Sequence, residues 1–145
     1  MEEEHVDQGP PEILTPEEQE HVDMRAWEGA EVLTNSEASL LLKRRVQLHQ
    51  QKNIAYEPPG VMTKTLDYCT KFANCTNQDS MNEMRRILIL DYGFKHHELG
   101  IILNLMPETA DEARTLVPSL ADPGRFDDDD HLERALEEVS KYRET

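Results

Sequence analysis

The chain has 145 residues, enough for one compact domain with an extension, and a formal net charge of −15 at pH 7. Phosphate repels a chain that is acidic as a whole, which excludes a nucleic-acid grip spread over the entire surface. No apolar run approaches the roughly 18–20 residues of a membrane span, and the acidic N-terminus lacks the features of a secretory signal. We therefore expect a soluble, intracellular protein with no membrane partner.

The acidic residues are concentrated at the two ends of the chain. Residues 1–35 hold 11 acids and one base, 36–105 hold seven acids and nine bases, and 106–145 hold 12 acids and five bases. Residues 1–25 also contain three prolines and show little apolar periodicity, so we expect an acidic, disordered N-terminus.

Residues 26–49 are predicted to form an arm with a short extended stretch near 26–33, followed by a helix. The sequence Thr34-Asn35-Ser36-Glu37 is a T-x-x-E capping box, which predicts a helix over 36–49. Leu41, Leu42, Val46 and Leu48 are expected to form its apolar side, and its outer side carries Lys43, Arg44 and Arg45. Pro58, Pro59 and Gly60 then predict a linker over 50–60.

Residues 61–145 are predicted to form a domain of short helices. A stripe of Met62, Leu66, Cys69 and Ala73 indicates a helix over 61–73. A capping box at Ser80 predicts a helix to about Asp91, with Gly93 as its C′ residue. A very apolar helix at about 95–105 should be central, and the last helix, at about 128–141, carries a stripe of Leu132, Ala135, Leu136 and Val139. With no convincing strand, the class is all-α: a small helical bundle preceded by an arm.

The segment NLMPETADEARTLVPSL, residues 104–120, resembles a DNA-reading helix-turn-helix in outline. However, the second helix would present Asp111 and Glu112 to the phosphates, which repel them. Pro107 ends one helix, the capping box at Thr109 begins the next, and Pro118 ends it. We therefore interpret this stretch as a structural corner.

No pattern of catalytic or metal-binding residues is convincing. Four consecutive acids at 127–130 cannot all face one cation, and they suit a helix N-terminus. Adjacent His96 and His97 point about 100° apart on a helix. Cys69 and Cys75 are expected to be buried thiols, and no activated nucleophile or phosphate-binding glycine loop is present. We predict no enzyme activity, no metal and no cofactor.

The apolar groups of residues 26–48 favour a role in assembly, because an isolated helix is only marginally stable in water and must pack on the following domain or on another protein. The basic clusters offer an alternative role, since they could contact RNA backbone if a partner supplied the rest of the surface. These residues are Lys43, Arg44, Arg45, Arg85 and Arg86.

Four stretches resemble the family of the fourth subunit of eukaryotic RNA polymerase II, a family that also has an archaeal polymerase member. They are WEGAEVLTNSEASLLLKRR, VMTKTLDYCTKFAN, FKHHELGIILNLMPETADEARTLVPSL and GRFDDDDHLERALEEV, within about residues 26–143. The most specific part is the apolar helix followed by N-L-x-P-E-T-A-[DE]-E and L-x-P-S-L.

This resemblance implies a non-catalytic nuclear subunit with a bundle similar to the helicase-and-RNase-D C-terminal fold. It implies tight pairing with the polymerase's seventh subunit in a stalk near the RNA exit path. That stalk binds the polymerase core, supports initiation and nascent-RNA handling, and shuttles to the cytoplasm. The residues that it implies for the pairing are Leu33, Leu40, Leu41, Leu42, Met62 and Leu66. The alternatives are the corresponding subunit of RNA polymerase III and a free helical RNA-binding module.

Overall fold

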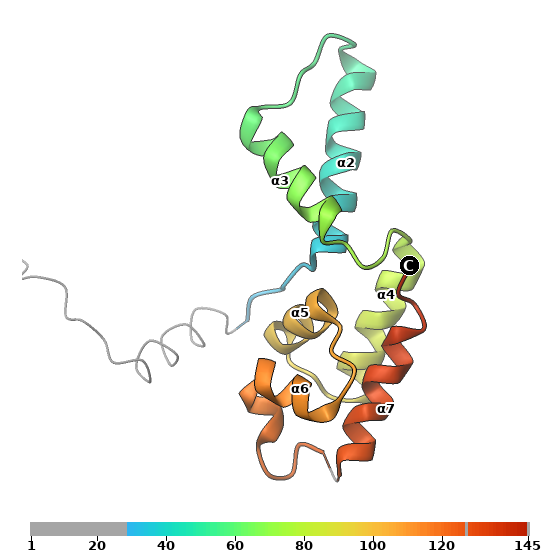
Figure 1. Ribbon diagram of the computed structural model, residues 1–145. Coiled ribbons are helices and arrows are strands. Elements are labelled where there is room, and N and C mark those ends of the chain that lie inside the picture. Colours follow the sequence, from blue (N-terminus) through green and yellow to red (C-terminus); the bar gives the residue numbers. More distant parts are fainter. Residues whose placement is uncertain (1–28, 127, 145) are drawn as a thin grey trace, which may run out of the picture. The chain divides into compact units, whose positions relative to one another are not determined.

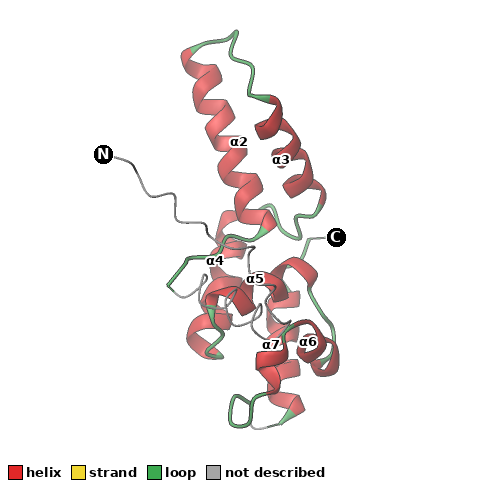
Figure 2. Ribbon diagram, turned by 90° about the vertical axis from the view of Figure 1, so that its left-hand side faces the viewer, coloured by secondary structure: helices red, strands yellow, loops and turns green. Residues whose placement is uncertain are grey.

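The computed structural model describes residues 29–126 and 128–144, which contain helices and no strand. This confirms the all-α class. The elements in chain order are α2 (Asn35–Lys52), α3 (Gly60–Lys71), α4 (Gln78–Arg86), the π-helical turn η1 (Ile87–Asp91), α5 (His96–Leu105), α6 (Ala110–Leu116), the 3₁₀ turn η2 (Pro118–Ala121) and α7 (Asp129–Ser140) (Figures 1 and 2). The expected disordered N-terminus and the first residues of the arm lie outside the described residues.

Helices α2 and α3 form an antiparallel hairpin (Figure 2). The predicted capping box begins α2: the Thr34 hydroxyl accepts a hydrogen bond from the Glu37 amide, and the Glu37 carboxylate accepts one from the Thr34 amide. However, α2 continues to Lys52, because Gln50, Gln51 and Lys52 are good helix formers and the prolines lie several residues further on.

The predicted linker over 50–60 is therefore a shorter loop between the two helices of the hairpin. In this loop the Tyr56 ring stacks on His49, with ring centroids 4.7 Å apart. α3 then begins at Gly60, directly after Pro59. Residues 31–145 form one compact unit, so the segments on the two sides of the loop belong together.

The start of α4 differs from the prediction. Its N-cap is Asn77, whose side-chain oxygen accepts hydrogen bonds from the amides of Asp79 and Ser80, and Ser80 lies inside the first turn. Asparagine caps a helix as well as serine does, so the earlier of two suitable residues is the cap. The helical path continues through η1, and Gly93 follows with a φ of 69°, as expected for a C′ glycine.

The hydrophobic core lies among α4, η1, α5, α6 and α7. Its largest fully buried apolar side chains are Leu88, Leu99, Ile102, Leu120, Leu132 and Val139. The predicted stripe on α7 is buried, and Asp128 caps that helix by accepting a hydrogen bond from the His131 amide. Cys69 and Cys75 are buried free thiols, as predicted.

The expectation that α5 is central is confirmed on one side only. Leu99, Ile102 and Leu103 are buried, whereas Ile101 and Leu105 are 36% and 57% exposed. The exposed pair is one turn apart on the helix and therefore shares a face. α5 thus has an apolar side that the bundle does not cover.

The corner over residues 104–120 has the predicted helix ends, but the capping box predicted at Thr109 is only half formed. Met106 adopts a left-handed conformation, with φ 49°, directly before Pro107. The Thr109 hydroxyl accepts a hydrogen bond from the Glu112 amide, and α6 ends before Pro118. The Glu112 carboxylate accepts from the Glu108 amide, so only half of a capping box is present. The stretch therefore fixes the angle between α5 and α6.

A buried ion pair holds the loop after α6 against α5. The Glu98 carboxylate is fully buried, and two nitrogens of the Arg125 guanidinium donate to it at 2.9 and 2.7 Å. The Ser119 hydroxyl and the Lys95 amide complete its hydrogen bonds at 2.6 and 2.8 Å. Burial raises the pKa of Glu98, but these hydrogen bonds and the Arg125 charge outweigh it and leave the pKa below its ordinary value.

Candidate partner interface

Residues 31–34, the part of the arm directly before α2, lie on α5, where Gly100 leaves room for Val32. A Cβ added at Gly100 would stand 2.6 Å from Cγ1 of Val32, which is too close for an unshifted contact. The Asn35 amide donates to the Asn104 side chain at 2.8 Å, one turn further along α5. Because successive side chains of an extended segment point to opposite sides, Val32 faces α5 while Leu33 is 51% exposed.

We expect the substitution Gly100→Val to lower the free energy of unfolding by about 1–3 kcal/mol, because its side chain overlaps Val32. The double variant Val32→Ala/Gly100→Val should recover part of this loss. Gly60→Val is a matched control, since nothing lies within 4 Å of a Cβ at Gly60. Urea unfolding of the variants measures the effect, and an equal loss in Gly60→Val would contradict the assigned contact.

An ion pair joins the arm, α2 and α4. Arg85 donates to both carboxylate oxygens of Glu37, at 2.9 and 2.7 Å, and to the carbonyl of Val32 at 2.6 Å. Burial raises the pKa of Glu37, but hydrogen bonds from Arg85 and Thr34 outweigh it and leave the pKa below its ordinary value. This bidentate ion pair, together with the bond to the Val32 carbonyl, fixes the arm directly before α2.

The end of α3 is fastened to α2 and α5 by polar contacts. The Ser36 hydroxyl accepts hydrogen bonds from the amides of Asn74 and Cys75, at 3.0 and 3.2 Å. The Asn74 side chain donates to the carbonyls of Leu103 and Asn104, both at 2.9 Å. The arm, the start of α2, the end of α3 and the end of α5 therefore meet at one junction.

We expect Ser36→Ala to destabilise the fold by about 1–3 kcal/mol, because two backbone amides lose their acceptor. Ser140→Ala is the matched control, since the exposed Ser140 hydroxyl donates only to a carbonyl of its own helix, that of Glu137. Thermal unfolding of both variants makes the comparison. Equal melting temperatures for the two variants would show that the Ser36 contacts contribute nothing.

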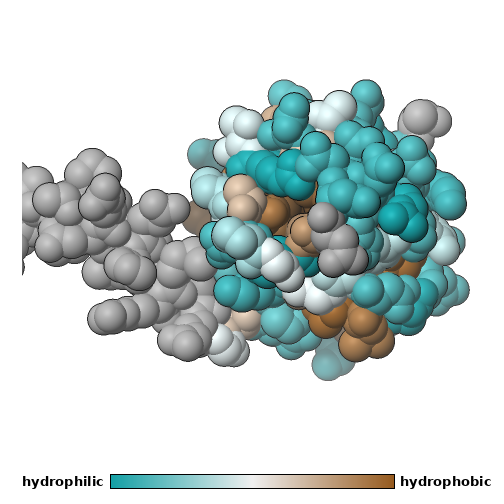
Figure 3. All heavy atoms as spheres, turned by 90° about the horizontal axis from the view of Figure 1, so that it is seen from below, coloured by the Kyte–Doolittle hydropathy of each residue, from teal (hydrophilic) through white to brown (hydrophobic). Residues whose placement is uncertain are grey.

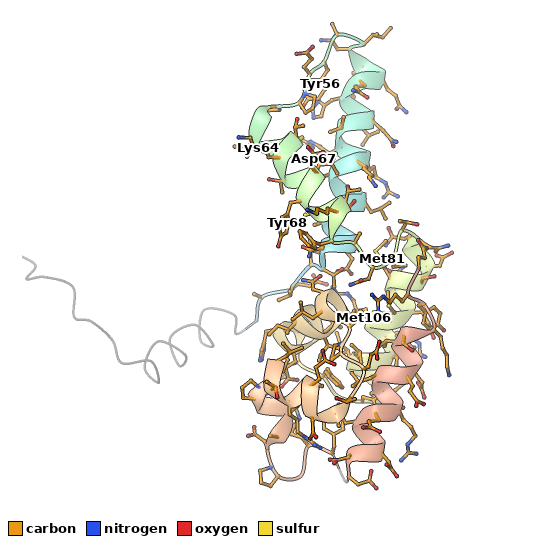
Figure 4. The ribbon with its side chains drawn as sticks, in the orientation of Figure 1. Tyr56, Lys64, Asp67, Tyr68, Met81 and Met106 are labelled. Carbon is orange, nitrogen blue, oxygen red and sulfur yellow. The ribbon has the colours of Figure 1, made fainter. Side chains whose placement is uncertain are left out.

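Three of the segments that meet at this junction, the arm, α3 and α5, carry exposed apolar side chains. Tyr68 and Phe72 are 58% and 47% exposed on α3, with ring centroids 4.8 Å apart. Figure 4 shows Tyr68 projecting from the end of α3 that leads into the junction. We call the following set the junction surface: Leu33 of the arm, Tyr68 and Phe72 of α3, and Ile101 and Leu105 of α5.

The end of the bundle seen in Figure 3 differs from the junction. That face is mostly hydrophilic, with small separate hydrophobic patches. The loop before α7 and the start of α7 carry exposed acids, at Asp122, Asp128, Asp129 and Asp130. The junction surface is therefore the better candidate for contact with another protein, since clustered apolar exposure marks interaction sites.

The residues predicted for pairing fall into three groups. Leu33 is exposed in the junction surface, and Leu41 is exposed on the outward side of α2. Leu40 packs against the core of this chain, so its apolar surface is largely used within the chain. The other three are half-buried residues of the α2–α3 hairpin: Leu42, Met62 and Leu66.

Sequence reasoning missed the exposed stripe of α3. Val61, Tyr68 and Phe72 recur at helical spacing, on a side about 100° around the helix from Met62, Leu66 and Cys69. Two apolar stripes on one short helix were the available signal, because a hairpin partner can bury only one of them. Lys71, whose ammonium lies 5.5 Å from the centre of the Phe72 ring, flanks the exposed stripe.

The basic residues predicted to face RNA differ in exposure and in whether they form ion pairs within the chain. Arg85 is bound to Glu37, and Arg86 forms ion pairs with Glu83 and Asp91 at 2.8 and 3.0 Å. Lys43 is half-buried, whereas Arg44 and Arg45 are exposed on α2. Two of the five charges are thus already compensated within the chain.

Within residues 29–126 and 128–144, no group of three or more histidine, cysteine or acidic side chains is arranged to hold a metal ion. In the same residues, no helix combines the length and the apolar composition that crossing a membrane requires.

An all-helical unit with a packed arm and an apolar junction surface defines a class of small helical proteins suited to assembly. The comparisons with known proteins identify the family within that class. The RNA polymerase Rpb4 family matches residues 32–143, and the chain belongs to this family.

Named relatives cover most of the chain. The DNA-directed RNA polymerase II subunit 4 of Arabidopsis thaliana is 36% identical over 115 residues, which are 77% of this chain and 81% of that protein. The subunit rpb4 of Schizosaccharomyces pombe is 34% identical over 119 residues, which are 81% of this chain and 84% of that protein. The subunit rpb4 of Dictyostelium discoideum is 28% identical over 134 residues, which are 82% of this chain and 83% of that protein.

Proposed function

We propose that this chain is a non-catalytic subunit of nuclear DNA-directed RNA polymerase II. It pairs with the seventh subunit to form the stalk near the RNA exit path, where the pair supports initiation and nascent-RNA handling and shuttles to the cytoplasm. Family membership and the names of the three relatives support the assignment to polymerase II. The observation that carries the pairing is the junction surface.

The junction surface suits a stable partner for two reasons. It includes two aromatic side chains, which are enriched in the energetically important centres of interfaces. It is also preorganised, because Gly100, Arg85 and Asn104 fix the arm, and Ser36 and Asn74 fix the end of α3. Little conformational freedom is lost there when a partner binds.

Coexpression with the seventh subunit tests the pairing. We expect a stable complex with the mass of one copy of each chain, and a melting temperature above that of the free chain, because binding to the folded state stabilises it. A free chain whose mass and melting temperature are unchanged by the seventh subunit would contradict the proposal.

The two alternatives have less support. All three relatives above carry polymerase II names, which disfavours the corresponding subunit of RNA polymerase III. A free RNA-binding module would rely on basic residues, of which Arg85 and Arg86 are already paired with carboxylates. Titration of single-stranded RNA at about 50 and 200 mM salt tests this second alternative, since charge-driven binding weakens steeply with salt.

A further inference from the structure

The outward side of α2 combines two exposed leucines with three exposed bases. Leu41 and Leu48 are 47% and 49% exposed, and Arg44, Arg45 and Lys52 are exposed with them. Because residues three and four apart are neighbours on a helix, both leucines adjoin Arg44 and Arg45, and Leu48 also adjoins Lys52. We call these five residues the basic–leucine face.

Nothing in the described part of this chain covers or neutralises that face. α3 packs on another side of α2, where Leu42 and Val46 are half-buried and the Ser39 and Thr70 hydroxyls lie 3.1 Å apart. Glu37 is the only acid in α2, and it is bound to Arg85. Among the described residues, no carboxylate forms an ion pair with any base of the face.

We propose that the basic–leucine face docks an acidic, amphipathic helical segment of another protein. Leu41 and Leu48 are seven residues apart, about 10.5 Å along the helix axis, which matches apolar side chains seven apart on a partner helix. Carboxylates on both sides of that apolar stripe meet Arg44, Arg45 and Lys52. The apolar contact supplies affinity, and the opposite charges select an acidic partner.

The chemistry of the face favours a peptide over RNA. Proteins bind single-stranded RNA by stacking its nucleobases on exposed aromatic rings. On this face the side chains between the arginines and the lysine are leucines, which are aliphatic. His49, the ring at this end of α2, is half-buried and stacks on Tyr56. The exposed rings of Tyr68 and Phe72 belong to α3 and to the junction surface. The inference is thus independent of the proposed pairing with the seventh subunit.

The test uses the full chain and a synthetic helical peptide of glutamate, alanine and two leucines seven residues apart, labelled with fluorescein. A scrambled peptide of the same composition is the first control. We expect saturable binding of the designed peptide in fluorescence anisotropy, weaker at about 200 than at about 50 mM salt. The scrambled peptide should bind at least about tenfold more weakly, because its leucines no longer share a face.

Variants of the chain locate the binding. Arg44→Glu/Arg45→Glu should weaken binding of the designed peptide by about tenfold or more. Leu41→Ala/Leu48→Ala should weaken this binding by about tenfold without any change in charge. Lys64→Glu/Lys71→Glu makes the same change in net charge on α3. This variant should bind the designed peptide within about twofold of the affinity of the unsubstituted chain. We expect all variants to fold, because the substituted side chains lie at the surface, and circular dichroism melts check this.

Three results would overturn the inference. The first is equal weakening by the α2 and α3 charge reversals. The second is binding of a labelled single-stranded RNA, but not of the peptide, that depends on Arg44 and Arg45. The third is self-association of the chain that Leu41→Ala/Leu48→Ala abolishes, since the face would then pair two copies.

Repeating the titration with the heterodimer separates this inference from the proposed function. Peptide binding by the free chain but not by a stable heterodimer would assign the face to the seventh subunit, and would reject the inference while the pairing stands. Peptide binding by a chain that forms no heterodimer would reject the pairing and leave the inference intact.

Discussion

Replacing Arg125 with alanine will lower the free energy of unfolding at pH 7 by about 3–5 kcal/mol. The substitution leaves the fully buried Glu98 carboxylate without its guanidinium, and only the Ser119 hydroxyl and the Lys95 amide still donate to it. Breaking a buried pair costs more than the pair contributes, because an uncompensated charge stays in the interior. Urea unfolding at pH 7 measures the loss.

Arg143→Ala is the control for that prediction. Arg143 is exposed near the C-terminus, and its substitution should change the free energy of unfolding by no more than about 0.5 kcal/mol. The contribution of the pair itself comes from a double-mutant cycle with Glu98→Gln. If Arg125→Ala were as mild as Arg143→Ala, the buried pair would not hold the loop against α5.

The pH dependence gives an independent check on the same pair. The pKa of Glu98 is lowered in the folded state, so its contribution to stability is present above the ordinary value of 4.5 and is lost as the pH falls through the folded pKa. In Arg125→Ala, burial should dominate and raise that pKa. The stability difference between the two proteins should therefore shrink on acidification from pH 7, and a constant difference would contradict this cause.

The double variant Phe72→Ala/Leu105→Ala should weaken binding of the seventh subunit by about 100-fold or more. Burying each side chain contributes roughly 1.5–3 kcal/mol, part of which is offset by ordering costs. The Phe72 and Leu105 side chains are 47% and 57% exposed in the free chain, so its own stability should change less than its binding of the seventh subunit. Isothermal titration calorimetry with the purified seventh subunit measures the effect.

Ile54→Ala/Leu90→Ala is the matched control for the junction surface. These two side chains are 96% and 73% exposed, in the loop between α2 and α3 and in η1. The control should bind the seventh subunit within about threefold of the wild-type affinity, because it removes similar apolar area away from the junction. An equal loss in both double variants would mean that the junction surface is not the pairing site.

Local sequence patterns predicted the helices because their signals act over a few residues. The capping box at Thr34, the glycine at Gly93 and the prolines around α6 each act on the nearest turn, and the structure has a helix end at each of them. The missed helix ends have the same local origin. Asn77, three residues before Ser80, is the N-cap of α4. The prolines after α2 lie too far along the chain to end that helix at His49, and it continues to Lys52.

The side of each helix that stays exposed could not be predicted in the same way. α5 reads as apolar on most sides, and only the packing of the arm and the bundle separates the buried Ile102 from the exposed Leu105. Similarly, Met62 and Tyr68 are both apolar residues of α3, and the position of α2 decides which one faces solvent. Interface residues depend on such contacts between distant segments, so they required the fold.

The basic residues show the same dependence on tertiary contacts. Arg85 and Arg86 are adjacent in a basic cluster, yet Arg85 reaches the Glu37 carboxylate 48 residues earlier in the chain. No local pattern contains that pair. By contrast, the charges of Arg44 and Arg45 could be judged from α2 alone, because their neighbours one turn away include no acid.

Purification of a tagged chain from nuclear extract tests the central claim most directly. Mass spectrometry then identifies the largest subunit that is recovered in equal amount with the tagged chain. We expect the largest subunit of RNA polymerase II, together with the seventh subunit. Recovery of the largest subunit of RNA polymerase III, or of no polymerase subunit, would contradict the assignment.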